Sequence, residues 1–194
     1  MNIYDFDGTI YHGESSTDFF FYCLKRYPKT WRYVLPTMFY GLGYLLRIVK
    51  KTKFKSKFLR FAGAVDDIDQ AVEDFWKINI KKVHKWYLEK KNPTDIVITA
   101  SPEYLIKPIG KMLGVERVIG SRVDKHIGIF YGTNCHGEEK VRRLMEIYPD
   151  AHVNEFYSDM YSDTPLAMLA ERAYIVKGER LKPWKFKNKK QDME

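Results

Sequence analysis

The stretch Asn2-Ile3-Tyr4-Asp5-Phe6-Asp7-Gly8-Thr9 lies near the start of the 194-residue chain and combines a short apolar run with two acids. The apolar run at residues 2–4 predicts a short strand, and Gly8 lets the backbone turn away after it. Side chains alternate along a strand, so we expect Asp5 and Asp7 to share one face. Open α/β sheets bind ligands at the carboxyl ends of their strands. Two acids in that place predict a metal site, a nucleophile with an acid/base partner, or both.

Short apolar runs recur along the rest of the chain, and helical patterns separate most of them. The predicted strands are Ile96–Thr99, Arg117–Gly120, Asn154–Ser158 and Ala173–Val176, and the predicted helices are Glu103–Leu113, Gly137–Tyr148 and Thr164–Glu171. Residues 121–133 contain two glycines and predict a hairpin or loop. Strand–helix alternation of this kind predicts an α/β fold, a Rossmann-like parallel sheet with helices on both faces.

More than eighty residues separate the first strand from the second, and none of them carries a convincing strand signal. Helices are predicted there over Ser15–Arg26, Trp31–Lys50, Phe54–Ala62 and Asp67–Lys91. We therefore predict an all-helical cap module, residues 12–91, inserted into a catalytic core formed by residues 1–11 and 92–181. Residues 182–194 are predicted to be a basic C-terminal tail.

The net charge of +8 is unevenly distributed along the chain. Between Phe19 and Val65 there is no Asp or Glu, but there are eleven Lys or Arg and 13 of the 30 aromatic residues. The uncharged stretch Tyr33–Leu46 is too short to span a bilayer, which takes ~20 apolar residues. It predicts a packed pair of cap helices, an interfacial segment against anionic lipid, or both. The basic tail is predicted to be a mobile end or to lie on a membrane or a polyanion.

The compartment follows from two features. The two cysteines, Cys23 and Cys135, form no CxxC pair, and the acidic motif already begins at residue 5, which predicts no signal peptide. We expect a cytoplasmic protein, with peripheral membrane contact through the basic aromatic cap as an open alternative. No nucleic-acid-binding motif is present, which makes nucleic acid the least favoured partner.

Three further groups of residues carry chemistry. Thr99-Ala100-Ser101 places a hydroxyl and turning backbone amides after a predicted strand, which suits a phosphate group. Lys140 begins a predicted helix, and Asp159 and Asp163 follow the fourth predicted strand. Carboxylates, water and substrate phosphate suit Mg²⁺. With one carboxylate as nucleophile and another as acid/base, these parts predict phosphate-ester hydrolysis.

Four motifs stand in order along the chain: Asp5-Phe6-Asp7-Gly8-Thr9, Ile96-Val97-Ile98-Thr99, Lys140, and Ser158-Asp159-Met160-Tyr161-Ser162-Asp163. In this order they resemble the motifs of haloacid dehalogenase-like phosphatases, over residues 1–10 and about 94–176. The resemblance implies a Mg²⁺-dependent phosphomonoester hydrolase that works through an aspartyl-phosphate.

The same resemblance implies a role for each matching residue. Asp5 would be the nucleophile and a metal ligand, and Asp7 the general acid/base whose backbone carbonyl also binds Mg²⁺. Lys140 would neutralise charge between nucleophile and phosphate. The remaining implied roles are phosphate binding by Thr99, Ala100 and Ser101, metal binding by Asp159, and support of the metal or of Lys140 by Asp163.

The inserted helices resemble the cap of phosphoserine phosphatases, which implies that Glu14, nine residues after Asp5, contacts the substrate. The aromatic, basic, Pro-containing insertion resembles phosphatidylglycerophosphatases more closely. So do the motifs at Gly137–Lys140, Tyr157–Pro165 and Val176–Glu179.

Three substrate classes and one other class of function therefore remain open. The substrate is a phospholipid phosphate, such as phosphatidylglycerophosphate, or a small soluble phosphate resembling phosphoserine. Polynucleotide ends, which a basic groove with aromatic residues suits, are the third and least favoured class. Phosphoryl transfer to a sugar hydroxyl would use the same intermediate. The alternative class is a non-enzymatic basic module that binds membranes or polyanions. The sequence leaves the physiological substrate, the oligomeric state and any opening of the cap undetermined.

Overall fold

A computed structural model describes residues 1–186, except for the side chain of Lys51. Within these residues the strands form one six-stranded sheet in the order β3-β2-β1-β4-β5-β6. The first five strands pair in parallel, and β6 runs antiparallel to β5. The predicted α/β fold is confirmed. The strands are β1 (Asn2–Tyr4), β2 (Ile96–Pro102), β3 (Arg117–Ser121), β4 (Val153–Ser158), β5 (Ala170–Lys177) and β6 (Arg180–Pro183).

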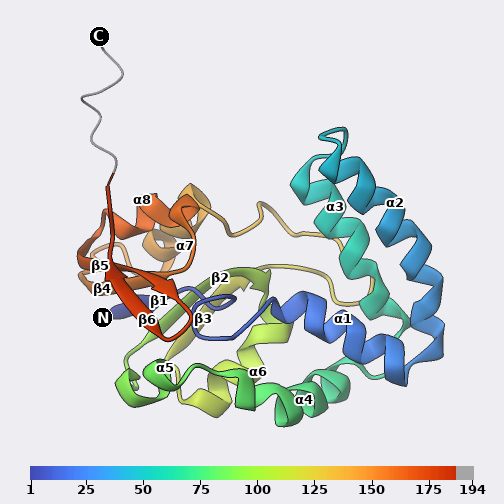
Figure 1. Cartoon of the computed structure of the whole chain (residues 1–194), viewed down its shortest axis with the longest axis horizontal. Coiled ribbons are helices and arrows are strands. Elements are labelled where there is room, and N and C mark those ends of the chain that lie inside the picture. The colour runs from blue at the N-terminus through green and yellow to red at the C-terminus, as the bar shows by residue number, and fades with distance from the viewer. Residues whose placement is uncertain (187–194) are drawn as a thin grey trace.

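Alternating side chains bury both faces of the sheet. Ile3 and Phe156 belong to one apolar cluster, whereas their neighbours Tyr4 and Tyr157 belong to the other. Helices complete both clusters, which is why the strands read as nearly continuous apolar runs. The first face is covered by α7 (Glu138–Ile147) and α8 (Thr164–Ala167), and the second by α6 (Glu103–Leu113), α4 (Ile68–Asn79) and α5 (Lys85–Lys90) (Figure 1).

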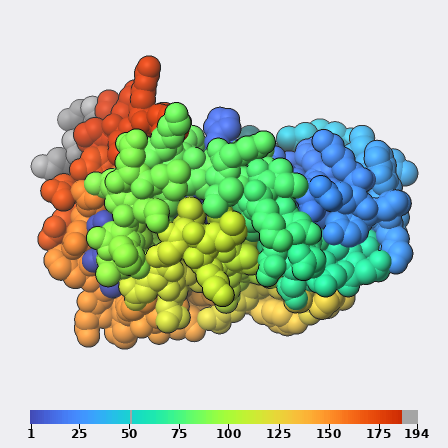
Figure 2. Space-filling model, turned by 90° about the horizontal axis from the view of Figure 1, so that it is seen from below, coloured from blue at the N-terminus to red at the C-terminus, as the bar shows by residue number. Residues whose placement is uncertain are grey.

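The inserted helices divide into a part that packs on the core and a part that projects from it. The indole N–H of Trp76 in α4 donates to the backbone oxygen of Leu105 in α6 at 2.6 Å, and α5 packs its Tyr87 against Tyr4 of β1. Figure 2 shows α4, α5 and α6 lying side by side on this face. The projecting part is the hairpin of α2 (Val34–Leu45) and α3 (Lys51–Phe58), reached through α1 (Ser15–Arg26) and a 3₁₀ helix at Pro28–Tyr33 (Figure 1).

The single helix predicted over residues 67–91 is wrong. It is broken between α4 and α5 by a 3₁₀ turn at Ile80–Lys82 and by an extended segment. In that segment Val83 forms a β-bridge with Tyr11, and the amide of His84 donates to the carbonyl of Ile10 at 2.8 Å. These backbone bonds to the loop after β1 replace helical ones.

The helix predicted over residues 31–50 is also shorter than expected. After α2 ends at Leu45, the amides of Ile48 and Val49 both donate to the carbonyl of Gly43, and Arg47 has a positive φ of 59°. The chain therefore reverses before α3. The helix predicted to reach Glu171 stops at Ala167, because β5 begins at Ala170.

The C-terminal segment starts inside the sheet and not as a free tail. The tail predicted from residue 182 begins within β6, and Trp184 is buried with its ring 5.8 Å from Phe156 and 5.1 Å from Tyr161. The rest of the predicted tail, from residue 187, lies outside the described residues.

Candidate active site

A cavity of about 300 Å³ lies at the carboxyl ends of β1, β2 and β4. All nine residues predicted from the sequence line it: Asp5, Asp7, Glu14, Thr99, Ala100, Ser101, Lys140, Asp159 and Asp163. The structure thus gathers them from four separate segments of the chain. Their individual chemical roles stay predictions.

The two acids of the first motif follow β1 and do not lie in it. The strand ends at Tyr4, so the turn after it, and not strand alternation, brings Asp5 and Asp7 to the same cavity. Gly8 adopts a positive φ of 69°, and a Cβ there would overlap a carboxylate oxygen of Asp159. The hydroxyl of Thr9 accepts a hydrogen bond from the amide of Asp159 at 2.9 Å. The turn therefore also fixes the loop after β4.

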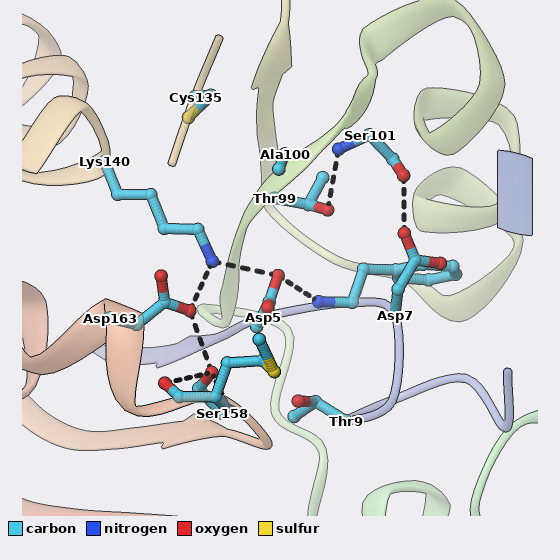
Figure 3. A network of polar contacts seen from close by, with 12 residues as sticks. Asp5, Asp7, Thr9, Thr99, Ala100, Ser101, Cys135, Lys140, Ser158 and Asp163 are labelled. Atoms are coloured by element: carbon cyan, nitrogen blue, oxygen red, sulfur yellow. Dashed lines mark hydrogen bonds and ion pairs between the residues drawn. The ribbon is translucent and has the colours of Figure 1, made fainter. Parts of the chain in front are cut away.

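Lys140 joins two carboxylates in the interior. Its Nζ lies 3.0 Å from Asp5 Oδ1 and 2.7 Å from Asp163 Oδ2, and its side chain is 1% exposed (Figure 3). Burial alone would lower the pKa of Lys140, but the two carboxylates outweigh it and raise that pKa. Lys140 is therefore a fixed cation beside Asp5.

Ser158 is a member of this network that the sequence did not single out. It ends β4, and its hydroxyl donates to Asp163 Oδ2 at 2.8 Å. The same oxygen of Asp163 contacts Lys140, so Asp163 is held on the lysine from two sides (Figure 3). Of the two roles implied for Asp163, these contacts favour support of Lys140.

Asp7 is held by two serines. Its Oδ1 accepts the amide of Ser15 at 2.8 Å, at the start of α1, and its Oδ2 accepts the hydroxyl of Ser101. Burial raises the pKa of Asp7, although both hydrogen bonds oppose the shift. A carboxyl group with a raised pKa suits acid/base catalysis. The role of Ser15 was missed, because only the fold brings α1 to this carboxylate.

The phosphate-binding segment predicted after β2 forms a hydrogen bond between two of its own residues. The amide of Ser101 donates to the hydroxyl of Thr99 at 3.1 Å, and the hydroxyl of Ser101 contacts Asp7. The pairing of β2 with β3 shifts register between Ile98 and Pro102, which lets this segment depart from a regular strand. Phosphate binding by Ser101 stays a prediction, and its hydroxyl also holds Asp7 by a hydrogen bond.

The residues of the cavity fit a magnesium ion. Burial raises the pKa of Asp5, and Lys140 only partly offsets this, so a second cation nearby would favour the ionised form. Asp159 Oδ1 is buried and accepts no hydrogen bond within the described part of the chain. In that same part no three His, Cys, Asp or Glu side chains are grouped to hold a metal alone. Mg²⁺ does not need such a group, because it binds one or two carboxylates and takes its other ligands from water and phosphate.

The projecting hairpin supplies one wall of the cavity, which the sequence did not predict. Phe54, Lys55, Phe58 and Leu59 line it from α3 and the turn that follows. The Nζ of Lys55 lies 3.4 Å from the backbone oxygen of Ala100, next to the predicted phosphate site. The wall is therefore mainly apolar, with a cation at its inner end.

A comparison with models of known protein families shows which family the chain belongs to. The family model described as haloacid dehalogenase-like hydrolase matches residues 3–168. The chain belongs to this family. The matched range contains every residue that lines the cavity, from Asp5 to Asp163. The resemblance found in the sequence motifs is confirmed.

The individual proteins that resemble this chain share little sequence with it, or match only part of it. Protein CicA of Caulobacter vibrioides is 33% identical over 88 residues, which cover 42% of this chain and only 40% of that protein's length. A protein of unknown function from Bordetella pertussis has a TM-score of 0.74 at 17% identity, covering 89% of this chain and 87% of its own. A probable phosphoserine phosphatase from Vibrio cholerae has a TM-score of 0.61 at 8% identity, covering 89% and 55%. The two structures show a shared fold.

Binding of Mg²⁺ gives a prediction that does not depend on turnover. At ten times the dissociation constant, Mg²⁺ adds about 1.4 kcal/mol of stability, which raises the melting temperature by about 3–6 °C in a chain of this size. We expect Asp159→Asn to remove most of this rise, because it replaces a carboxylate that lines the cavity. Differential scanning fluorimetry with and without Mg²⁺ measures both proteins. Asp150→Asn, in an exposed loop, serves as the control; an undiminished rise in Asp159→Asn would rule out Asp159 as a ligand.

Proposed function

We propose that this protein is a Mg²⁺-dependent phosphomonoester hydrolase in which Asp5 carries the phosphoryl group. The observation that carries the proposal is the pairing of Asp5 with the buried Lys140 at 3.0 Å, in the same cavity as the acid/base candidate Asp7. The fold shared with a probable phosphoserine phosphatase from Vibrio cholerae supports a phosphatase by analogy.

In the first step, a carboxylate oxygen of Asp5 attacks the substrate phosphorus, and the bond from phosphorus to the leaving oxygen breaks. Asp7, whose raised pKa favours its protonated form, gives its proton to the leaving oxygen. Lys140 holds Asp5 in place and offsets negative charge between the carboxylate and the phosphate. The product of the step is an aspartyl-phosphate and a free alcohol.

In the second step, the Asp7 carboxylate takes a proton from water as the water oxygen attacks phosphorus. The bond between phosphorus and Asp5 breaks, which releases inorganic phosphate and restores the Asp5 carboxylate. Ser15 and Ser101 keep Asp7 in one orientation through both steps. When bound, Mg²⁺ would neutralise phosphate oxygens, with Asp5 and Asp159 as its carboxylate ligands.

For the substrate we propose a lipid phosphomonoester of the phosphatidylglycerophosphate type. The α3 wall supports this, because Phe54, Phe58 and Leu59 offer apolar surface and Lys55 adds a cation for an anionic headgroup. A small amine phosphate such as phosphoserine is the second candidate. It is favoured by Glu14, an exposed acid on the rim of the cavity that suits an ammonium group.

The choice of substrate is tested by phosphate release from purified protein with Mg²⁺. The panel contains phosphatidylglycerophosphate and phosphatidic acid in mixed micelles, phosphoserine, sugar phosphates and nucleotides. We expect the highest kcat/KM for a lipid phosphate. A preference for phosphoserine that Glu14→Gln abolishes would instead establish the second candidate, and no release from any ester would leave only a binding module.

A further inference from the structure

Helix α2 turns an apolar stripe to the solvent. Leu35, Met38, Phe39, Leu42 and Leu45 are 57–77% exposed, although they follow the i, i+3, i+4, i+7 spacing of a helix face that packs against a core. All of α2 lies within the described residues, and none of its twelve residues is buried. Together with Leu46 and Ile48 beyond the helix end, they form what we call the α2 face.

The opposite side of α2 is already occupied by α3. The ring of Tyr44 stacks on Phe54 at 5.6 Å, and a Cβ on Gly41 would lie 3.5 Å from the same ring. Figure 1 shows this hairpin standing away from the sheet. The α2 face is therefore the outer surface of a projecting element. Seven large apolar side chains exposed together on one projecting element mark an interaction surface.

The charged residues that neighbour the α2 face along the chain are all cations. Arg32 and Arg47 flank it and Lys50 follows, all three are exposed, and the chain has no Asp or Glu from residue 19 to residue 65. Trp31, at the same end as Arg32, is 61% exposed. Aromatic rings and cations beside an apolar helix face are typical of helices that lie at the interface of an anionic bilayer.

We propose that the α2 face docks this protein on an anionic lipid bilayer, with α2 lying in the headgroup region. The helix is about 18 Å long, well short of the ~30 Å hydrocarbon core. Among the described residues no helix has the length and apolar character to span a membrane. A second copy of the chain fits the face less well. A two-fold pairing would bring like charges from both copies together, and an anionic surface neutralises them.

This inference goes beyond the proposed reaction, and it does not depend on it, because docking needs no hydrolysis. The two are connected only through the hairpin. Phe54 of α3 stacks on Tyr44 of α2 and also lines the cavity. Docking through α2 would therefore hold α3, one wall of the cavity, one helix away from the membrane surface.

The test is vesicle co-sedimentation of the full chain with vesicles of phosphatidylcholine, and with vesicles in which part of the phosphatidylcholine is replaced by phosphatidylglycerol. We expect binding to the second kind only. The variant Leu35→Gln/Phe39→Gln should lose at least about tenfold in partitioning, because it removes two inserting side chains. Arg32→Gln/Lys50→Gln should lose about fivefold for each cation.

Matched controls separate docking from general effects. Met168→Gln removes an apolar side chain that is 71% exposed elsewhere, and Lys111→Gln removes an exposed cation on α6; both should bind like the wild type. Circular dichroism confirms that each variant is folded. Wild-type protein that stays in the supernatant, or α2 variants that bind as well as the controls, would overturn the proposal. So would a dimer in light scattering that Leu35→Gln/Phe39→Gln dissociates without any vesicle binding.

Discussion

Asp5→Asn is expected to lower kcat by at least about a thousandfold while leaving the protein folded. Asparagine keeps the shape of the side chain but cannot act as the attacking carboxylate. The fold should tolerate it, because burial already disfavours the charge on Asp5 and Lys140 keeps its second partner, Asp163. Turnover of the preferred phosphate ester measures the loss of kcat, and the melting temperature shows whether the protein is folded. Both are measured with Mg²⁺.

Asp66→Asn is the matched control for this variant, since it neutralises an exposed aspartate that pairs with Lys29 on the surface. It should keep wild-type turnover. If Asp5→Asn kept a tenth or more of the wild-type rate, another residue would be the nucleophile.

Lys140→Met is expected to lose both activity and stability. The lysine is 1% exposed and contacts two carboxylates, so its removal leaves two like charges facing each other in the interior. Breaking a buried pair in this way costs about 3–5 kcal/mol, which lowers the melting temperature by about 6–20 °C in a chain of this size. Thermal unfolding at pH 7 in EDTA measures the loss without interference from metal.

The stability lost in Lys140→Met should depend on pH, and it should be smaller at low pH. Lys140 lowers the pKa of Asp5, so that pKa rises further in the variant. A folded-state pKa above the unfolded value gives stability that is present at low pH and is lost as the pH rises through it. The difference between wild type and variant should therefore shrink as the pH falls.

Asp163→Asn in the Lys140→Met background should restore part of the stability, because it removes one of the two carboxylates. Lys111→Met, on the exposed surface of α6, is the control for the loss of a lysine as such. A Lys140→Met protein as stable as this control would mean that the network contributes nothing to folding.

The site could be predicted further from sequence than the fold around it. Four short motifs, the two residues after the second of them (Ala100 and Ser101) and Glu14 supply all nine of the cavity residues that we singled out, because the chemistry restricts the residue types at each position. The partners that orient them were missed. Ser15 reaches Asp7 only through the fold, and nothing in its local sequence distinguishes it from an ordinary serine. Ser158 stands in the fourth motif, but the motif alone did not indicate that its hydroxyl contacts Asp163.

The misread helices have a similar cause. The pattern over residues 67–91 is helical throughout, but bonds from Val83 and His84 to the loop after β1 compete with helix hydrogen bonds. A contact between residues about seventy positions apart leaves no periodic signal. The α3 wall of the cavity could not be predicted either, because it also depends on contacts between residues that are far apart in the sequence.

The missed strand β6 did leave a signal. Lys177 pairs with Arg180 across a two-residue loop, Gly178-Glu179, in which Gly178 has a positive φ of 60°. Glycine at the first position of a two-residue loop that follows an apolar strand is typical of a hairpin. The lysines around it instead suggested a free tail, so charge was given more weight than turn chemistry.

Trapping the phosphoryl group on Asp5 tests directly whether this residue is the nucleophile. In Asp7→Asn, an aryl phosphate still reacts in the first step, because its leaving group needs no proton, but water is no longer activated in the second. After acid quenching, peptide mass spectrometry should find phosphate on Asp5 at close to one per molecule, and hydroxylamine should remove it. Aryl phosphate hydrolysis by the wild type, with no phosphorylated Asp5 in the variant or with the phosphate on another residue, would contradict the account.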